Sequence, residues 1–208
     1  MVYPFLTRAV EAGLMIFNRL AGKIQANLRL GIFLPLLAAA LATTWFGLFW
    51  SVDYFGVLTN GLHFMDMQPV LTVSALFVQI RTYDAAATQF YLWWSLFDWA
   101  WPLITFTTML FITAWLLNRL AAKWHYLFPW LVGSAYLTVV MDWLENVGFA
   151  TLVVLRPDEP LWAAQLTLVL HAAKLFFILV FNLGFWLLLV TVIVVGMRSL
   201  FANIRAAD

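Results

Sequence analysis

The chain has 208 residues, of which 65% are hydrophobic and only 10% are charged. Soluble domains carry about 25% charged residues, so this composition indicates a single integral membrane domain. The formal net charge of +1 provides no electrostatic field for nucleic acid, which we exclude as a partner. Because the sequence contains no cysteine, it has no disulfide, thiolate metal site or cysteine nucleophile.

The N-terminal segment, residues 1–29, predicts an amphipathic helix that lies at the membrane surface. At 100° per residue its apolar side chains separate from its polar ones: Leu6, Val10, Phe17, Ile24 and Leu28 against Arg8, Glu11, Asn18 and Arg19. A basic face opposite an apolar face is typical of helices that bind anionic membrane surfaces. The alternative is a cytosolic lead-in without a membrane role.

Residues 30–208 predict an all-α membrane domain, a bundle of four transmembrane helices. Four apolar segments reach the roughly 20 residues that a hydrocarbon core requires. They cover residues 31–52, 90–118, 126–155 and 161–197. Pro102 is expected to bend the second of these helices. Residues 53–89 are interrupted by glycine, proline and charge, and predict a structured outer loop with a short helix over Val70–Ile80.

Lysine and arginine are divided unequally between the two sides of this topology. Eight fall on the side of the two termini: Arg8, Arg19, Lys23, Arg29, Arg119, Lys123, Arg198 and Arg205. Only Arg81 and Arg156 fall on the other side. Because basic loops are retained in the cytoplasm, we predict that both termini are cytoplasmic.

The third predicted helix carries a polar stripe in an otherwise lipid-like segment. Asp142, Glu145 and Asn146 have the spacing i, i+3 and i+4, so they share one helical face. Ionisable groups at membrane depth cost at least ~2.5 to 3.5 kcal/mol each, so they seldom persist without a partner. We therefore expect this stripe to face the interior of the bundle.

Ionisable residues of two other helices fall at a similar depth. At 1.5 Å per residue, Asp98 lies ~12 Å below the outer end of the second helix. Glu145 and His171 each lie ~15 Å below the outer ends of their helices, and Lys174 lies one turn deeper than His171. The three helices therefore predict a buried polar chamber in the outer half of the bundle.

The charges of this layer do not balance. Asp98, Asp142 and Glu145 are acidic, whereas Lys174 and a protonated His171 are the only bases. Low dielectric and repulsion between like charges favour neutral carboxyl groups. We predict that Lys174 pairs with Asp142 and that at least one carboxyl group, Glu145, retains a proton near neutral pH.

Such a chamber predicts binding, and conversion by acid–base chemistry, of a small lipophilic molecule or membrane lipid. In this hypothesis Glu145 carries the proton and His171 relays it. Asp98 and Asn146 orient the ligand, while Asp142 and Lys174 form a supporting ion pair.

Four alternatives remain open. The layer could be a structural lock that joins three helices. The chain could be a non-catalytic accessory or scaffold subunit of a larger membrane complex, or a homo-oligomer. It could be a proton-linked transporter, although it lacks an inverted repeat. A metal held by Asp98, Asp142, Glu145 and His171 is disfavoured, because the chain lacks Glu-x-x-His pairs and Lys174 would repel a cation. No motif indicates a cofactor.

Two further groups of polar residues have simpler interpretations. His63 and Asp66 have i, i+3 spacing in the outer loop and could cover the chamber, but solvent-exposed loop residues are the simpler reading. His125 follows Lys123 and Trp124 and is expected at the membrane interface. Gly133, Ser134 and Gly148 are small residues that permit close helix packing.

One combination of motifs resembles a known group of proteins. Phe97-Asp98 and Trp101-Pro102 occur in one helix, Asp142-x-x-Glu145-Asn146 in the next, and a lysine in the last. This combination is similar to an uncharacterised family of small bacterial four-helix membrane proteins, over residues 90–180. The resemblance implies a common bundle in the bacterial inner membrane and no particular activity. The sterol-isomerase and sigma-2-receptor-like group is similar in outline only.

Overall fold

The computed structural model describes the backbone of residues 3–205 and the side chains of residues 11–199. The described part is all-helical and contains four helices that are long and apolar enough to span a membrane. They cover Leu30–Leu58, Ala85–Leu117, Ala122–Val154 and Leu161–Ser199. This confirms the predicted fold class at that level. The side chains of Leu6, Arg8, Val10 and Arg205, used in the predictions above, lie outside those described.

The first long helix is continuous but changes its helical type. It consists of α2 (Leu30–Thr44), the π-helical η1 (Trp45–Ser51) and α3 (Val52–Leu58), and so extends beyond the predicted end at residue 52. Gly47 lies in η1, where an added Cβ would stand 3.2 Å from the ring of Phe97 and 3.3 Å from that of Trp94. The missing side chain therefore lets two aromatic rings of the second helix approach the backbone.

The second long helix breaks where a bend was predicted. It consists of α5 (Ala85–Phe97) and α6 (Trp101–Leu117), and Asp98 follows directly on α5. Pro102 lies in the first turn of α6, where the amide hydrogen that proline lacks would have no intrahelical partner. At the other end, Asp84 caps α5 by accepting a hydrogen bond from the amide of Ala87 at 2.7 Å.

The third and fourth long helices pack along one another. They are α7 (Phe128–Val154), preceded by the 3₁₀ turn η3 (Ala122–Leu127), and α8 (Leu161–Arg205). An added Cβ at Gly148 of α7 would collide with Thr167 of α8, and one at Gly184 of α8 would collide with Leu131 of α7. The two helices therefore approach closely at two glycines, one towards each end of α7.

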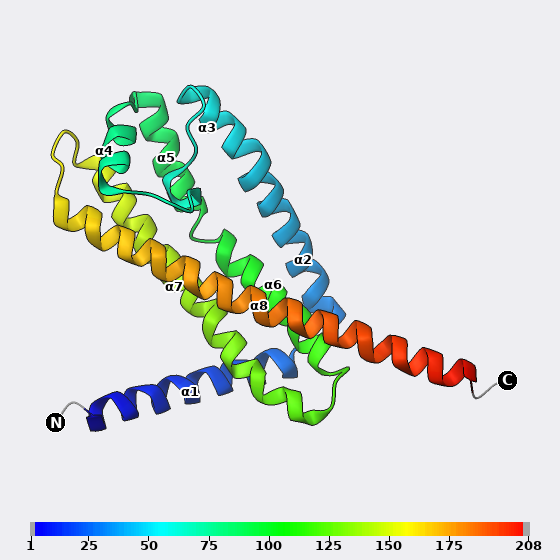
Figure 1. Ribbon diagram of the computed structural model, residues 1–208. Coiled ribbons are helices and arrows are strands. Elements are labelled where there is room, and N and C mark those ends of the chain that lie inside the picture. Colours follow the sequence, from blue (N-terminus) through cyan, green and yellow to red (C-terminus); the bar gives the residue numbers. More distant parts are fainter. Residues whose placement is uncertain (1–2, 206–208) are drawn as a thin grey trace.

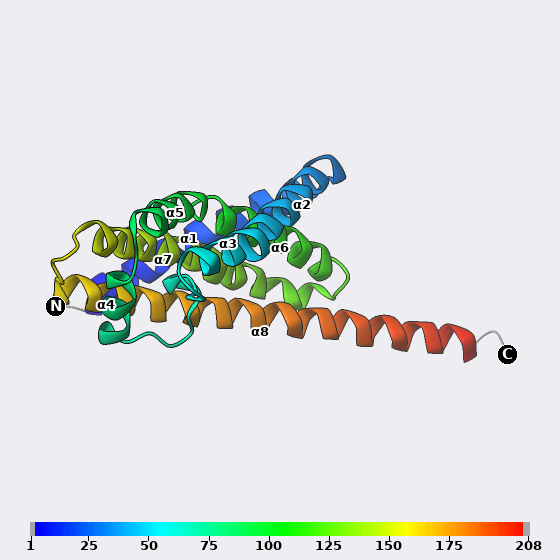
Figure 2. The ribbon, with the colours of Figure 1, turned by 90° about the horizontal axis from the view of Figure 1, so that it is seen from above.

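The elements gather at two ends of the bundle (Figure 1). At the end we call the loop end lie α3, the 3₁₀ turn η2 (Met65–Met67), α4 (Val73–Arg81) and the turn between α7 and α8. Towards the opposite end, which we call the α1 end, α1 (Tyr3–Ala26) lies across the bundle and packs on α6 and α7. The C-terminal part of α8 projects beyond the other helices in both ribbon views (Figure 2).

Part of the apolar face of α1 packs against the rest of the protein. Ala21 and Ile24 are buried, and Phe17 contacts the backbone of α7 at Gly133, where an added Cβ would lie 2.9 Å from the ring. Met15 and Ile16 remain exposed. The predicted amphipathic helix therefore exists, and its apolar side chains are divided between the bundle and the surroundings.

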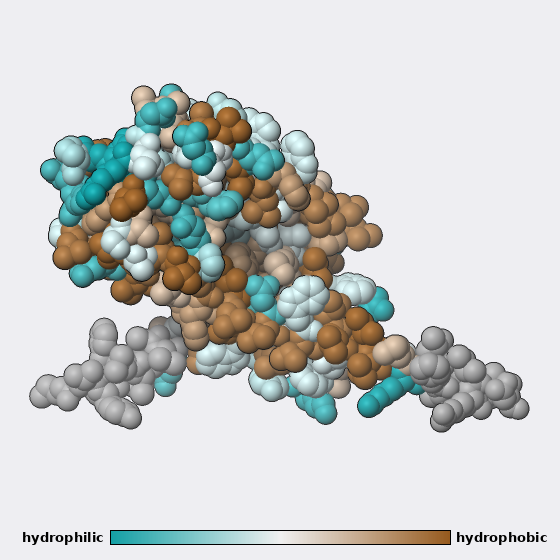
Figure 3. Space-filling view, turned by 45° about the horizontal axis from the view of Figure 1, so that its top comes forward, coloured by the Kyte–Doolittle hydropathy of each residue, from teal (hydrophilic) through white to brown (hydrophobic). Residues whose placement is uncertain are grey.

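Two hydrophobic cores correspond to the two ends. The core at the loop end is strongly aromatic and includes Phe55, Phe64, Tyr91, Trp94 and Phe149. The core at the α1 end is built mainly from α6, α7 and α8, with aliphatic residues and a few phenylalanines. In a space-filling view, hydrophilic residues gather at the loop end while hydrophobic residues cover much of the middle of the same face (Figure 3).

Candidate functional site

Six ionisable or amide side chains from three long helices meet in the half of the bundle near the loop end. Each of them is at most 6% exposed. They are Asp98, Asp142, Glu145, Asn146, His171 and Lys174, which we call the polar cluster. Asp98 comes from the α5–α6 break, the next three residues from α7, and the last two from α8. The convergence predicted from helix periodicity and depth is therefore confirmed, while the roles of these residues remain predictions.

Asn146 joins the two aspartates. Its amide nitrogen Nδ2 donates to Asp98 Oδ2 at 2.9 Å and to Asp142 Oδ2 at 3.3 Å. These bonds use both amide hydrogens, so the side-chain oxygen Oδ1 is left as an acceptor. The hydrogen bonds of Asn146 to the described side chains of the cluster both run through Nδ2, and neither uses this oxygen. Asp98 Oδ1 is buried and lacks a hydrogen-bond partner among the described residues.

Lys174 is the central cation of the polar cluster. Its Nζ lies 3.1 Å from Asp142 Oδ1 and 2.8 Å from Glu145 Oε2. The contact with Glu145 has the distance of an ion pair but not the angles of a hydrogen bond, so we treat it as electrostatic. Nζ also donates to the backbone oxygen of Asp66 at 3.2 Å. The predicted pairing of Lys174 with Asp142 is confirmed, and Glu145 is a second partner.

His171 and Glu145 share a proton. His171 Nε2 lies 2.8 Å from the backbone oxygen of Gln68, which can only accept, so Nε2 carries a hydrogen. His171 Nδ1 lies 2.8 Å from Glu145 Oε1, and two acceptors at that distance would repel each other. One proton therefore lies between them, either on the imidazole as an ion pair or on the carboxyl group as a neutral pair.

The loop that contains η2 covers the polar cluster from the loop end. Besides the backbone oxygens of Asp66 and Gln68, it contributes the Asp66 carboxyl group, whose Oδ2 lies 3.4 Å from Trp94 Nε1. Burial raises the pKa of this carboxyl group above its ordinary range, and the Lys174 ammonium partly offsets that rise. The polar cluster is thus completed by a loop, whose position helical periodicity in the sequence cannot predict.

The prediction that Asp66 is a solvent-exposed loop residue is wrong. It is 7% exposed, because its neighbours Phe64 and Met65 are fully buried in the aromatic core and pull the loop inward. His63 is exposed, as predicted, but its backbone oxygen accepts a hydrogen bond from Gln79 Nε2 at 2.7 Å. The apolar Phe64-Met65 pair beside Asp66 was the signal that could have revealed its burial.

An apolar groove reaches the polar cluster from the side. It lies between α5 and α7 and has a volume of about 530 Å³. Its lining residues are Leu92, Ser95, Leu96, Trp99, Asn146, Val147, Ala150, Thr151, Val154 and Leu155. Asn146 is the member of the polar cluster that lines it. The remaining members contact one another beneath the loop, and Asn146 connects them to this groove.

The polar cluster does not have the form of a metal centre. Within the described residues, no group of three or more His, Asp and Glu side chains is arranged to hold a metal ion. Lys174 stands between Asp142 and Glu145, where a cation would be repelled. Asn182, eight residues beyond Lys174 in α8, donates to the backbone oxygen of Ile178 at 3.0 Å and stays outside the cluster.

Comparisons of the chain with protein-family models, with curated proteins and with solved structures found no significant match. The resemblance described above therefore rests on its motifs alone. The fold and site nevertheless define a class of protein. It is an all-helical protein with four helices long and apolar enough to span a membrane, built around a buried cluster of acids and bases.

Proposed function

We propose that the chain is an integral membrane protein that binds a small lipophilic molecule in the groove between α5 and α7. The four long helices cross the membrane, with the loop end outside and both termini in the cytoplasm. The distribution of lysine and arginine supports this orientation, since eight lie on the side of the termini and two at the loop end. With the motif resemblance, this favours the bacterial inner membrane.

One observation carries the proposal: Asn146 belongs both to the polar cluster and to the wall of the groove. Its amide hydrogens are engaged by Asp98 and Asp142, which leaves Oδ1 as the acceptor of a residue that lines the groove. An acceptor without a donor is costly in an apolar environment, so the preferred ligand has a hydroxyl or amine group that donates to it. The surrounding side chains are apolar and would contact the hydrocarbon part of that ligand.

A groove-filling variant tests this binding site. The protein is purified in mild detergent, and its bound small molecules are extracted and identified by mass spectrometry. We expect one apolar compound in stoichiometric amount in the wild type, lost on Ala150→Phe, which fills the groove one helical turn from Asn146. Ala172→Phe is the matched control, because Ala172 is exposed on α8 outside the groove. No bound compound, or equal amounts in both variants, would argue against the site.

The second candidate function is acid–base conversion of that ligand, favoured by the proton shared between Glu145 and His171. With that pair neutral, three ionised aspartates beside Lys174 would leave two uncompensated negative charges in the bundle. Such charges are costly at low dielectric, so we infer that the cluster holds further protons. In this mechanism Glu145 carries the proton and His171 relays it. Asp98 and Asn146 orient the ligand, and Asp142 and Lys174 hold Glu145 in place.

Glu145→Gln separates this mechanism from a structural role. Infrared difference spectra recorded while ligand is added should show a carboxyl band that shifts in the wild type and is missing in the variant. The variant should still fold and bind the ligand, because glutamine keeps the shape of the side chain. An unchanged carboxyl band on ligand binding would remove the acid–base proposal and leave the binding site standing.

The rival function, an accessory subunit or homo-oligomer, is favoured by α8. This helix has 45 residues and thus a length of roughly 68 Å, about twice the hydrocarbon thickness. Its C-terminal half exposes Trp186, Leu187, Val190 and Ile193. Co-purification in mild detergent of the wild type and of a Leu187→Ala, Val190→Ala variant tests it. A partner or second copy lost in the variant supports this function.

A further inference from the structure

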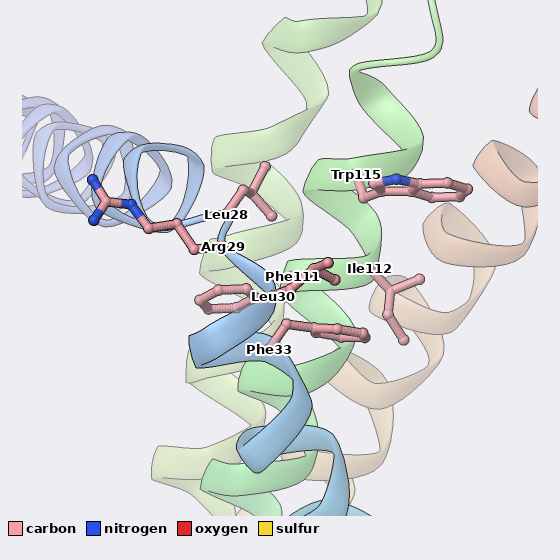
Figure 4. Close-up of a pocket in the computed structure, with 7 residues that line it drawn as sticks. All are labelled: Leu28, Arg29, Leu30, Phe33, Phe111, Ile112 and Trp115. Atoms are coloured by element: carbon pink, nitrogen blue, oxygen red, sulfur yellow. The ribbon is translucent and has the colours of Figure 1, made fainter.

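A second apolar groove lies towards the α1 end, remote from the polar cluster. It is formed where the connection between α1 and α2 passes the C-terminal half of α6 (Figure 4). Its volume is about 560 Å³, within the range of pockets that hold small ligands. Phe33, Phe111 and Ile112 contribute its apolar surface.

The groove has basic residues at its rim. Arg29 lies where α1 connects to α2, and its guanidinium group points away from the apolar side chains (Figure 4). Trp115 lines the α6 side, and the guanidinium carbon of Arg119 is 4.6 Å from the centre of a Trp115 ring. The cation–π contact holds the second positive charge close to the groove. No acidic residue is among the described residues that line it.

We propose that this groove binds an anionic phospholipid of the cytoplasmic leaflet. The acyl chain lies against Phe33, Phe111 and Ile112, while the positive charges of Arg29 and Arg119, on opposite sides of the rim, attract the anionic head group. The position fits the proposed orientation, because the α1 end carries the excess of basic residues and therefore lies at the height of the cytoplasmic head groups. A tryptophan beside an arginine is also typical of the membrane interface.

The positive charge at the rim of this groove favours anionic over zwitterionic phospholipids. A zwitterionic head group places a positive charge near the arginines, whereas an anionic head group does not. Each basic residue near a membrane surface contributes roughly a fivefold preference for anionic lipid, so two should give about 25-fold. The inference depends on the four helices crossing a membrane, and it is independent of a ligand between α5 and α7.

Native mass spectrometry of the full chain in mild detergent tests the site. Phosphatidylglycerol and phosphatidylcholine with identical acyl chains are titrated separately, and we expect phosphatidylglycerol to bind about 25-fold more tightly. The double variant Arg29→Gln, Arg119→Gln should lose this preference without changing phosphatidylcholine binding. Arg19→Gln, Arg198→Gln is the matched control with the same loss of charge outside the groove, and it should keep the preference.

Two further measurements identify the occupant. Ile112→Trp fills the groove and should weaken the binding of both lipids, whereas excess inorganic phosphate should not displace phosphatidylglycerol. Equal affinities for the two lipids in the wild type, or a preference that survives Arg29→Gln, Arg119→Gln, would overturn the proposal. Displacement by phosphate would indicate a simple anion site, and a dimer that excludes lipid would assign the groove to a second copy of the chain.

Discussion

The two ends of the bundle are held together by different interactions. At the loop end, α7 and α8 are joined by buried contacts among Asp142, Glu145, His171 and Lys174, and a loop adds two backbone acceptors. At the α1 end, the same two helices meet through apolar side chains, including Leu131, Phe181 and Leu188. One pair of helices thus contains a directional interface and a non-directional one.

The apolar contacts hold the two helices together, whereas the polar contacts determine their relative position. Apolar contacts in a membrane tolerate sliding and rotation, because lipid tails are as apolar as the side chains. Ion pairs and hydrogen bonds need particular atoms at particular distances, so the polar cluster sets the register of α7 against α8. We expect substitutions at the loop end to cost more stability than comparable ones at the α1 end.

The largest effect is expected for Lys174→Met. Removal of one partner from a buried charge network typically costs about 3–5 kcal/mol, because the remaining charges lose their compensation. The free energy of unfolding in detergent should fall by this amount. Asn182→Leu on the same helix should cost less than about 1 kcal/mol, because it removes one hydrogen bond to the helix backbone. Equal losses in the two variants would contradict an ionic lock at the loop end.

The two glycine contacts between α7 and α8 give the next effect. An added Cβ at Gly148 would meet Thr167 Oγ1 at 2.2 Å and its Cβ at 3.0 Å. Thr167 is β-branched and donates to the backbone oxygen of Ala163 at 2.8 Å, so it cannot easily turn away. Gly148→Ala should therefore destabilise the protein by about 2–3 kcal/mol.

The control for that substitution lies at the α1 end. At Gly184 the close contact, 2.4 Å, is with the terminal Cδ2 of Leu131, and its other atoms are at least 3.6 Å away. Rotation of one leucine relieves this contact, so Gly184→Ala should cost about 1 kcal/mol or less. Thermal unfolding in the same detergent compares the two variants, and a larger loss at Gly184 would reverse the predicted order.

The sequence was most informative where helical geometry converts spacing into position. The i, i+3, i+4 pattern correctly placed Asp142, Glu145 and Asn146 on an inward face, and the constant rise per residue brought Asp98, His171 and Lys174 to the same layer. The burial of Asp66 could not be predicted in this way, because Asp66 belongs to a loop and loops have no regular side-chain periodicity. The two backbone acceptors of that loop carry no sequence signal, and the groove beside Asn146 depends on how α5 and α7 pack.

Asp66 supplies a smaller, pH-dependent effect. Burial raises its pKa above the ordinary value of 3.8, so the folded protein keeps a proton that the unfolded chain has already lost. Stability should therefore fall as pH rises from 3.8 to the raised pKa and level off above it. The loss is about 1.4 kcal/mol for each unit that separates the two pKa values.

Asp66→Asn isolates this contribution. The amide keeps an oxygen for Trp94 Nε1 but cannot titrate, so the variant should be the more stable protein at neutral pH. Unfolding of the wild type and variant, measured over a series of pH values, should give curves that converge towards acid and separate towards neutrality. Parallel curves would mean that Asp66 titrates alike in both states and would place it outside the buried cluster.

The smallest effect is expected for the exposed ion pair between Arg81 and Glu159. Its two hydrogen bonds are short, 2.5 and 2.7 Å, yet the side chains are 64% and 32% exposed. Water and salt screen such a pair, and ordering two long side chains offsets much of the attraction. Arg81→Gln should leave the unfolding temperature unchanged within error at physiological ionic strength.

The neighbouring Arg156→Gln is the positive control. Arg156 donates to three backbone oxygens, those of Val153 near the end of α7, Ile80 near the end of α4, and Tyr83. A loss at Arg81 as large as that at Arg156 would show that charge alone stabilises the loop end. We expect instead that burial, and not the number of charges, distinguishes the two ends of the bundle.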